Sequence, residues 1–221
     1  MTQGIAFFDF DDTLARGDSI LPFLLYCIRK RISPRRQLVK AAGAFLYWKL
    51  RPSRASRASR AKSATLSFLK GRSADEMLDV ARAFFRDEYL PRFYQDGLTE
   101  LWSLRSQGMK LVVVSASPDV YMRALPEFMP IDAVLSTRCE VGGDGRYTGQ
   151  VGENCKGEEK VRRIEQYLKE NGFVLDMKCS SAYGDSPSDA DMMALVNRAV
   201  LVNPKKALLR RRPDGIVVHW T

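Results

Sequence analysis

Histidine is nearly absent from this sequence, because His219 is the only one among 221 residues. Catalysis by Ser-His-Asp or Cys-His groups needs a histidine beside the nucleophile, and zinc sites built from histidine need several. One histidine at this position also argues against a phosphohistidine mechanism. The chemistry of this chain must therefore be carried by carboxylates, hydroxyls and lysines.

Cysteine pairs and long apolar runs are lacking as well. The cysteines at 27, 139, 155 and 179 form no CxxC pair and no metal-type cluster, so we expect a reduced, cytoplasmic setting. The start, Met1-Thr2-Gln3-Gly4, leads directly into a strand, and we expect no signal peptide. The apolar stretches 19–28 and 41–50 are shorter than the roughly 18 residues of a membrane span. They leave open a peripheral contact at the inner face of a membrane.

Acidic residues are scarce in one part of the chain. Residues 16–72 contain fifteen lysines and arginines but one acid, Asp18, which gives net +14 in a protein of net +9, so the remainder carries −5. The basic segment predicts attraction to anions, whether phosphate substrates, anionic lipid or nucleic acid. Within it, the Arg-Ala-Ser repeat at 51–60 fits a solvated arginine surface better than a dedicated binding motif.

Three carboxylates follow an apolar, strand-like run at 5–8. Asp9, Asp11 and Asp12 lie within four positions. Carboxylates repel one another, so such a strand end needs a cation or hydrogen-bond donors to offset the charge. Mg²⁺ is the usual cation for a site made of oxygen ligands. The alternative is an ordinary Asp-rich turn, and the rest of the sequence argues against it.

The hydrophobic pattern predicts an α/β protein. Strands are expected at 111–114, 133–135, 180–183 and 199–202, a hairpin at 139–149, and helices at 19–28, 34–48, 73–86, 97–107, 118–129 and 157–171. Strands that alternate with helices after residue 97, together with the first strand, indicate a Rossmann-like doubly wound parallel sheet. We therefore expect a core of residues 1–15 and 96–221 and an inserted helical cap domain of residues 16–95.

Polar side chains follow several of these strands, at the edge where ligands bind in such sheets. They are Asp9 and Asp11 after the first strand, Ser115 after the second, and Asp185 and Asp189 near the last. The helix that follows Gly157 brings Lys156, or Lys160 one turn later, to the same side. Carboxylates, a hydroxyl and a lysine without histidine suit phosphoryl transfer through an aspartyl-phosphate.

The expected groups divide the chemistry among themselves. Mg²⁺ held by Asp9, Asp185 and a backbone carbonyl near Asp11 would bridge a phosphate oxygen and let two anions approach. Asp9 would attack phosphorus. Asp11, which strand alternation places on the opposite side, would protonate the leaving oxygen and later remove a proton from water. Ser115 and the lysine would donate to the equatorial oxygens.

Four stretches resemble the motifs of the haloacid dehalogenase superfamily. They are Asp-Phe-Asp-Asp-Thr at 9–13, an apolar strand ending in Ser115, Asn-Cys-Lys-Gly-Glu at 154–158 and Gly-Asp-Ser-Pro-Ser-Asp at 184–189. The match extends over the whole expected catalytic body. The large insert between the first two motifs is similar to the helical C1 cap of the phosphoserine-phosphatase-like branch, subfamily IB.

The resemblance implies roles for the aspartates. Asp9 would be the nucleophile and a magnesium ligand, and Asp11 the general acid and base, with its carbonyl on the metal. Asp185 would complete the protein ligands, and Asp189 would support the metal's water shell or the lysine. Transport ATPases of this superfamily carry threonine where Asp11 stands and keep their aspartyl-phosphate longer, so an aspartate favours fast hydrolysis.

The resemblance leaves the phosphate and substrate contacts more open. Ser115 and Lys156 would bind phosphate, but some relatives, including the phosphatidylglycerophosphatase C type, place the lysine where Lys160 stands. Ser188 occupies the place of an asparagine phosphate ligand in phosphoserine phosphatases. Asp18 stands where these enzymes have a glutamate that holds the serine ammonium. The cap lacks the Ser-Leu-Arg-x-Arg-Val stretch whose arginine would hold the serine carboxylate.

We therefore expect a Mg²⁺-dependent phosphomonoester hydrolase that acts on a small phosphorylated metabolite such as phosphoserine. A lipid-phosphate phosphatase at an anionic membrane surface is the second hypothesis, because arginines flank the apolar stretches. A basic nucleic-acid-binding protein is the third, and it is disfavoured because aromatic residues do not alternate with the arginines. The sequence leaves open whether phosphate passes to water or to an alcohol, and whether the chain oligomerises.

Overall fold

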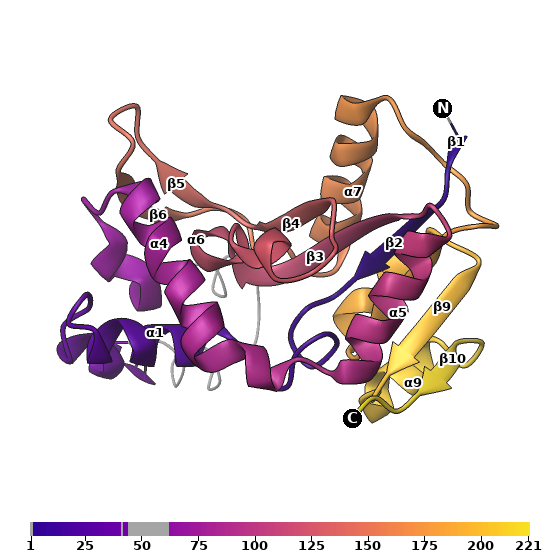
Figure 1. Ribbon diagram of the computed structural model, residues 1–221, viewed down its shortest axis with the longest axis horizontal. Coiled ribbons are helices and arrows are strands. Elements are labelled where there is room, and N and C mark those ends of the chain that lie inside the picture. The colour runs from indigo at the N-terminus through magenta and orange to yellow at the C-terminus, as the bar shows by residue number, and fades with distance from the viewer. Residues whose placement is uncertain (1, 41, 44–61) are drawn as a thin grey trace.

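A six-stranded parallel sheet lies at the centre of the computed structural model, which describes residues 2–40, 42–43 and 62–221 (Figure 1). The strands are β1 (Thr2–Gln3), β2 (Ile5–Phe8), β3 (Lys110–Pro118), β4 (Ala133–Thr137), β5 (Cys139–Val141), β6 (Tyr147–Val151), β7 (Val174–Leu175), β8 (Ser181–Gly184), β9 (Arg198–Val202) and β10 (Ile216–Val218). The α-helices are α1 (Ile20–Arg29), α4 (Ala74–Phe84), α5 (Gln95–Ser106), α6 (Asp119–Met122), α7 (Glu158–Asn171), α8 (Ala190–Met193) and α9 (Lys206–Arg211). Residues 36–40 and 62–66 are also helical.

The order of the strands puts β2 at a switch point. The sheet runs β10-β9-β8-β2-β3-β4, and each neighbouring pair is parallel. Ala6 of β2 pairs with Leu111 of β3 on one side and with Ser181 of β8 on the other. The chain thus proceeds outward from β2 in both directions, and ligands bind at the carboxyl end of such a strand. The predicted doubly wound sheet is confirmed.

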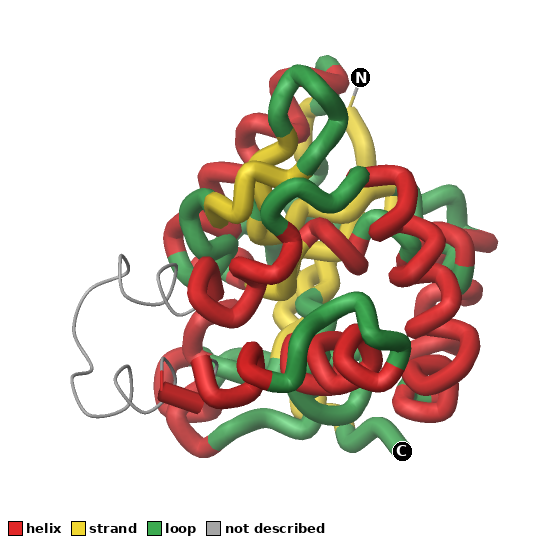
Figure 2. Tube along the Cα trace, turned by 90° about the vertical axis from the view of Figure 1, so that its left-hand side faces the viewer, coloured by secondary structure: helices red, strands yellow, loops and turns green. Residues whose placement is uncertain are grey.

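Both faces of the sheet are covered, which explains the unbroken apolar runs of β2 and β3. Ile5 and Phe7 pack in one cluster with residues of α7, α8 and α9. Ala6 and Phe8 pack on the opposite face with residues of α5 and α6, as the alternation of side chains along a strand requires. Figure 2 shows the strands inside the molecule with helices around them.

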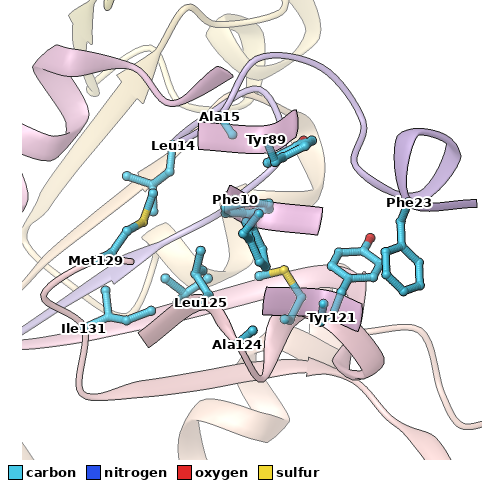
Figure 3. Packing of buried hydrophobic residues seen from close by; sticks show 14 of the residues in the cluster. Phe10, Leu14, Ala15, Phe23, Tyr89, Tyr121, Ala124, Leu125, Met129 and Ile131 are labelled. Atoms are coloured by element: carbon cyan, nitrogen blue, oxygen red, sulfur yellow. The ribbon is translucent and has the colours of Figure 1, made fainter. Parts of the chain in front are cut away.

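Aromatic side chains join the predicted cap to the sheet. The ring of Phe23 in α1 lies 5.2 Å from that of Phe84 in α4 and 4.7 Å from that of Tyr121 in α6, between centroids. Phe10, just after β2, stacks on Tyr89 at 5.8 Å (Figure 3). The apolar cluster is therefore continuous from the segment 16–95 to the sheet. The division into a core of 1–15 and 96–221 and a cap stays a prediction.

The hairpin is present as the glycine pattern predicted. β5 and β6 pair in antiparallel fashion, and Gly145 takes a positive φ of 73° in the turn. The backbone N–H of Gly71 donates to Tyr147 at 2.8 Å, and the N–H of Tyr147 donates to Arg72 at 2.9 Å. The hairpin is thereby attached to the chain that leads into α4.

The prediction of a long helix at 118–129 is wrong. β3 runs on to Pro118, α6 has four residues, and a 3₁₀ turn follows at Leu125–Glu127. Pro126 explains the break, because proline lacks the amide donor and its ring clashes with the preceding turn. The predicted helix 34–48 is described only as far as residue 43, and the repeat at 51–60 lies outside the described residues. Within the described parts, no helix is long and apolar enough to cross a membrane.

Candidate active site

Asp9 lies directly after the central strand β2. Its backbone N–H donates to the carbonyl of Tyr183 in β8 at 2.9 Å, so the sheet ladder extends to this residue. The chain then turns sharply, with Asp12 at a φ of 60° and its N–H donating to Ala15 at 2.7 Å. Asp9 and Asp11, two positions apart, therefore meet different neighbours.

Lys160 is the cation beside Asp9. Its ammonium lies 2.7 Å from Asp9 Oδ1 and 2.7 Å from Asp189 Oδ1, and its side chain is 1% exposed. The other oxygen of Asp189 accepts from the backbone N–H and the hydroxyl of Ser186, at 3.0 and 2.9 Å. A buried ammonium between two carboxylates is held in one place, so Lys160 fixes the orientation of Asp9.

The carboxylates around Asp9 form a site suited to a hard cation. Oxygens of Asp9, Asp185 and Asp189 lie within 4.8 Å of one another, and all three residues are buried. Lys205 pairs with Asp185 at 2.5 Å and with Asp12 at 3.2 Å. Four carboxylates thus face two lysines, which leaves two negative charges for a divalent cation to balance. Burial raises the pKa of Asp9, and although Lys160 opposes that shift, Asp189 and Asp185 add to it. The donor set therefore fits Mg²⁺.

Asp11 lies in a separate pocket of hydroxyl groups. Its Oδ2 accepts from the Ser117 hydroxyl at 2.5 Å, and its Oδ1 accepts from the backbone N–H of Ser19 at 3.0 Å. The Ser19 hydroxyl in turn lies 2.8 Å from those of Ser117 and Tyr121. Burial raises the pKa of Asp11 to about 7, and Asp18 adds to the shift, while the bonds from Ser117 and Ser19 oppose it. The Asp11 carboxyl can therefore gain and lose a proton near neutral pH.

The other predicted site residues are placed unequally. Ser115 is buried, and its Oγ accepts from the backbone N–H of Ser117 at 3.0 Å. Ser188 Oγ lies 2.7 Å from that of Ser186, next to Asp189. Asp18 is exposed and accepts from the N–H of Ile20 at 2.9 Å.

Between the two candidate lysines the structure makes a clear distinction. Lys160 reaches Asp9, whereas Lys156 is exposed and has no ion pair among the described residues. Gly157, with φ 61° and ψ −130°, turns the chain between Lys156 and the start of α7. The turn leaves Lys156 outside the acid cluster.

The described geometry combines an acid cluster at a strand switch point with a buried lysine and a separate carboxyl of raised pKa. A model of the family described as haloacid dehalogenase-like hydrolases matches residues 6–194 of the chain. The chain belongs to this family. It is therefore an enzyme of the hydrolase class, and the resemblance read from the four motifs is confirmed.

Two similar proteins illustrate the relatives of this hydrolase. Protein CicA of Caulobacter vibrioides is 30% identical over 197 residues, which are 86% of this chain and 82% of that protein. A protein named histidinol-phosphatase, from Neisseria meningitidis, is 26% identical over 93% of both chains. The name of the second relative agrees with the predicted phosphatase class.

Solved structures of the same fold include a phosphoserine phosphatase. The crystal structure of a protein of unknown function from Bordetella pertussis Tohama I matches with a TM-score of 0.86 and 22% identity, over 99% of both chains. The apo form of a phosphoserine phosphatase matches with a TM-score of 0.63 and 18% identity, over 98% of this chain and 92% of that one. The predicted likeness to the phosphoserine-phosphatase branch is confirmed at the level of the fold.

Contacts that the sequence did not predict surround the acids of this hydrolase. Lys62, from the helical residues 62–66, donates to the carbonyl of Ala116 and to Asn154 Oδ1. Burial lowers the pKa of Lys62 to about 8, although Asp11 and Asp18 oppose the shift. Lys62 lies among many basic residues, so its sequence position gave no signal. Lys205, after β9, and Ser117, near the end of β3, were missed because neither lies in a distinctive motif.

Proposed function

We propose that this hydrolase cleaves phosphate monoesters through an aspartyl-phosphate on Asp9. The observation that carries the proposal is the different surroundings of two nearby carboxyl groups. The carboxylate of Asp9 is held by the ammonium of Lys160, whereas that of Asp11 is held by the hydroxyl of Ser117 and the backbone N–H of Ser19. A nucleophile and a proton carrier need this kind of difference between their environments.

In the proposed reaction Asp9 attacks phosphorus and the ester oxygen leaves. Asp11, in its protonated form, gives its proton to that oxygen, and then accepts a proton from the water that hydrolyses the acyl phosphate. Lys160 keeps the attacking oxygen in place and faces the phosphoryl oxygens with positive charge. Mg²⁺, when bound by Asp9, Asp185 and the carbonyl of Asp11, would neutralise charge so that two anions can meet.

Ser115 is suited to bind the phosphoryl group. Its Oγ accepts a hydrogen bond from the N–H of Ser117, which leaves the hydroxyl hydrogen free to donate to a phosphate oxygen. Asp189 is assigned a positioning role, because one of its oxygens contacts Lys160 and the other the Ser186 hydroxyl. Ser188 and Asp18 stay predictions as phosphate and substrate contacts.

The proposed substrate is a small phosphorylated metabolite such as phosphoserine. The fold shared with a phosphoserine phosphatase and the relative named histidinol-phosphatase support this substrate class. The lipid-phosphate and nucleic-acid hypotheses, and contact with an anionic membrane, stay predictions. Transfer of the phosphoryl group to an alcohol instead of water also stays open.

The experiment that tests the proposal measures turnover of a panel of phosphate esters, with Mg²⁺ and with a chelator. The panel contains phosphoserine, histidinol phosphate, sugar phosphates, nucleotides and phosphatidylglycerol phosphate. We expect Asp9→Asn to lower kcat at least about a thousandfold for the preferred ester, because the nucleophile is lost. Asp214→Asn, which removes an exposed carboxylate next to Arg212, is the control and should keep full activity. Turnover that survives Asp9→Asn would contradict the mechanism.

A further inference from the structure

A basic hollow lies away from the aspartates, where α1 ends. It has a volume of about 830 Å³ and is lined by the chain that follows α1 and by Arg72. Four arginines face it: Arg29, Arg31, Arg35 and Arg72. None of the residues around Asp9 or Asp11 described above lines this hollow. It is therefore a separate candidate site, and the proposed hydrolysis does not involve it.

Two of these guanidinium groups have no partner of any kind among the described residues. Arg29 pairs with Glu88, and Arg72 donates to the carbonyl of Ile32 at 2.6 Å. Arg31 and Arg35 are exposed, and their guanidinium groups have no ion pair or hydrogen bond to any residue that the structure describes. Positive charges gathered in one hollow repel one another, and an anion that enters between them removes that repulsion.

The backbone at Arg31 is unusual in the same place. Its φ is 60°, the left-handed region that glycine favours at the end of a helix. The N–H groups of Ile32 and Ser33 both donate to the carbonyl of Cys27, at 2.8 and 3.1 Å, which closes the end of α1. An arginine here thus keeps a backbone conformation that glycine would adopt with less strain. Backbone N–H groups already satisfy the carbonyl of Cys27, so this carbonyl does not compete with a ligand for the arginine side chains.

A hydroxyl group without a partner belongs to the same hollow. Ser33 lines it and is 3% exposed, and its Oγ has no hydrogen-bond partner among the described residues. A buried hydroxyl normally has a partner, so an unsatisfied one calls for a ligand atom or a bound molecule. Guanidinium groups beside a hydroxyl donor match the oxygens of a phosphate group, which arginine binds through two parallel bonds.

We propose that this hollow binds a phosphate group through Arg31, Arg35 and the hydroxyl of Ser33. The group is carried either by a soluble molecule or by a phospholipid headgroup at a bilayer surface. Both sources present the same oxygens and negative charge. A phosphate group bound in this hollow would lie on the predicted cap, apart from the phosphate group that is hydrolysed. It would serve regulation or docking.

The test compares two double variants that lose the same charge. Arg31→Gln/Arg35→Gln removes the two unpaired arginines of the hollow. Arg36→Gln/Lys40→Gln removes two exposed cations of the same segment that do not line it. All four side chains are exposed, so both variants should fold and melt like the wild type. Equal melting temperatures check this before binding is measured.

Two arms separate the possible sources of the phosphate group. In the first, inorganic phosphate is titrated in the presence of chelator, and the arginine Nε–H signals are followed by NMR. In the second, the protein is sedimented with phosphatidylglycerol vesicles, with phosphatidylcholine vesicles as the neutral reference. We expect binding in at least one arm, weakened tenfold or more in Arg31→Gln/Arg35→Gln and less than twofold in the control.

The pattern across the arms decides the outcome. If Arg31→Gln/Arg35→Gln weakens the binding of inorganic phosphate, the hollow binds a soluble phosphate. If it weakens the binding of phosphatidylglycerol vesicles, the hollow binds a lipid headgroup. Equal weakening in both double variants would show a diffuse basic surface and would overturn the proposal. Absence of binding by the wild type in both arms would overturn it as well.

Discussion

Lys160 carries its charge in a buried position, where the carboxylates of Asp9 and Asp189 take the place of water. Removing one member of a buried ion pair leaves the others uncompensated, which costs about 3–5 kcal/mol. We predict that Lys160→Met lowers the free energy of unfolding by about that amount and lowers kcat about a hundredfold or more, because charge stabilisation at the phosphoryl group is lost. Urea unfolding and steady-state kinetics measure the two effects.

Lys156→Met is the matched control for Lys160→Met. Lys156 is exposed, so we expect the Lys156→Met variant to keep the free energy of unfolding and the kcat of the wild type. The opposite ranking of the two variants would show that Lys156 is the phosphate-binding lysine.

Asp11 provides a prediction about pH. A general acid works in its protonated form, and the pKa of Asp11 is raised to about 7, so kcat should fall as the pH rises above about 7. Asp11→Asn should lower kcat by about 10²–10⁴-fold and abolish this alkaline limb. A pH–rate profile of both proteins tests the assignment. The same alkaline limb in Asp11→Asn would assign the titration to another group.

At the level of single residues, sequence reasoning was strongest where the chain is most constrained. The aspartates at 9, 185 and 189 follow strands, and the ends of parallel strands must share one edge, so their gathering was predictable. The choice between Lys156 and Lys160 was not. It depends on the backbone turn at Gly157, whose conformation no local pattern specifies.

Among the glycines, Gly184 at the end of β8 leaves the least room for a Cβ. A Cβ at Gly184 would lie 2.6 Å from the Cβ of Asp189. We predict that Gly184→Ala displaces Asp189 from Lys160, destabilises the protein by about 1–3 kcal/mol and lowers kcat at least tenfold. Thermal unfolding and kinetics provide the measurement.

Gly43→Ala is the control for the effect of the added methyl group. A Cβ at Gly43 meets no atom of the described residues within 4 Å, so activity and stability should hardly change. If Gly184→Ala behaved like this control, the close contact between β8 and Asp189 would not matter for the site.

Elements with a clear hydrophobic pattern were predicted well. The amphipathic repeat of α7 and the apolar runs of β3, β8 and β9 gave the right elements. The helix expected at 118–129 failed because Pro126 and tertiary packing divide it, and β10 was missed because its residues are few and half exposed. Local pattern is a weak guide where packing decides the outcome.

The whole molecule should respond to the cation that its acid cluster suits. A ligand that binds only the folded state stabilises it, by about 2.7 kcal/mol at a hundredfold excess over Kd. We predict that Mg²⁺ raises the Tm of the wild type at constant ionic strength and raises that of Asp185→Asn much less. Equal shifts in the two proteins would mean that the ion binds elsewhere.

The fold of the molecule was predictable because strands alternate with helices over most of the chain. The continuous aromatic cluster of Phe10, Phe23, Phe84 and Tyr121 was not, since it joins segments far apart in the sequence. Contacts between residues far apart in the sequence leave no local pattern. The hydrogen bond from Lys62 to Asn154 is another contact of this kind.

The covalent role of Asp9 is tested most directly by trapping the phosphoenzyme. The protein is quenched in acid during turnover with Mg²⁺, reduced with borohydride and mapped by mass spectrometry. An aspartyl-phosphate is reduced to homoserine, so the mechanism predicts homoserine at position 9 in the wild type and none in Asp9→Asn. Turnover without homoserine at position 9, or with the label on another aspartate, would contradict it.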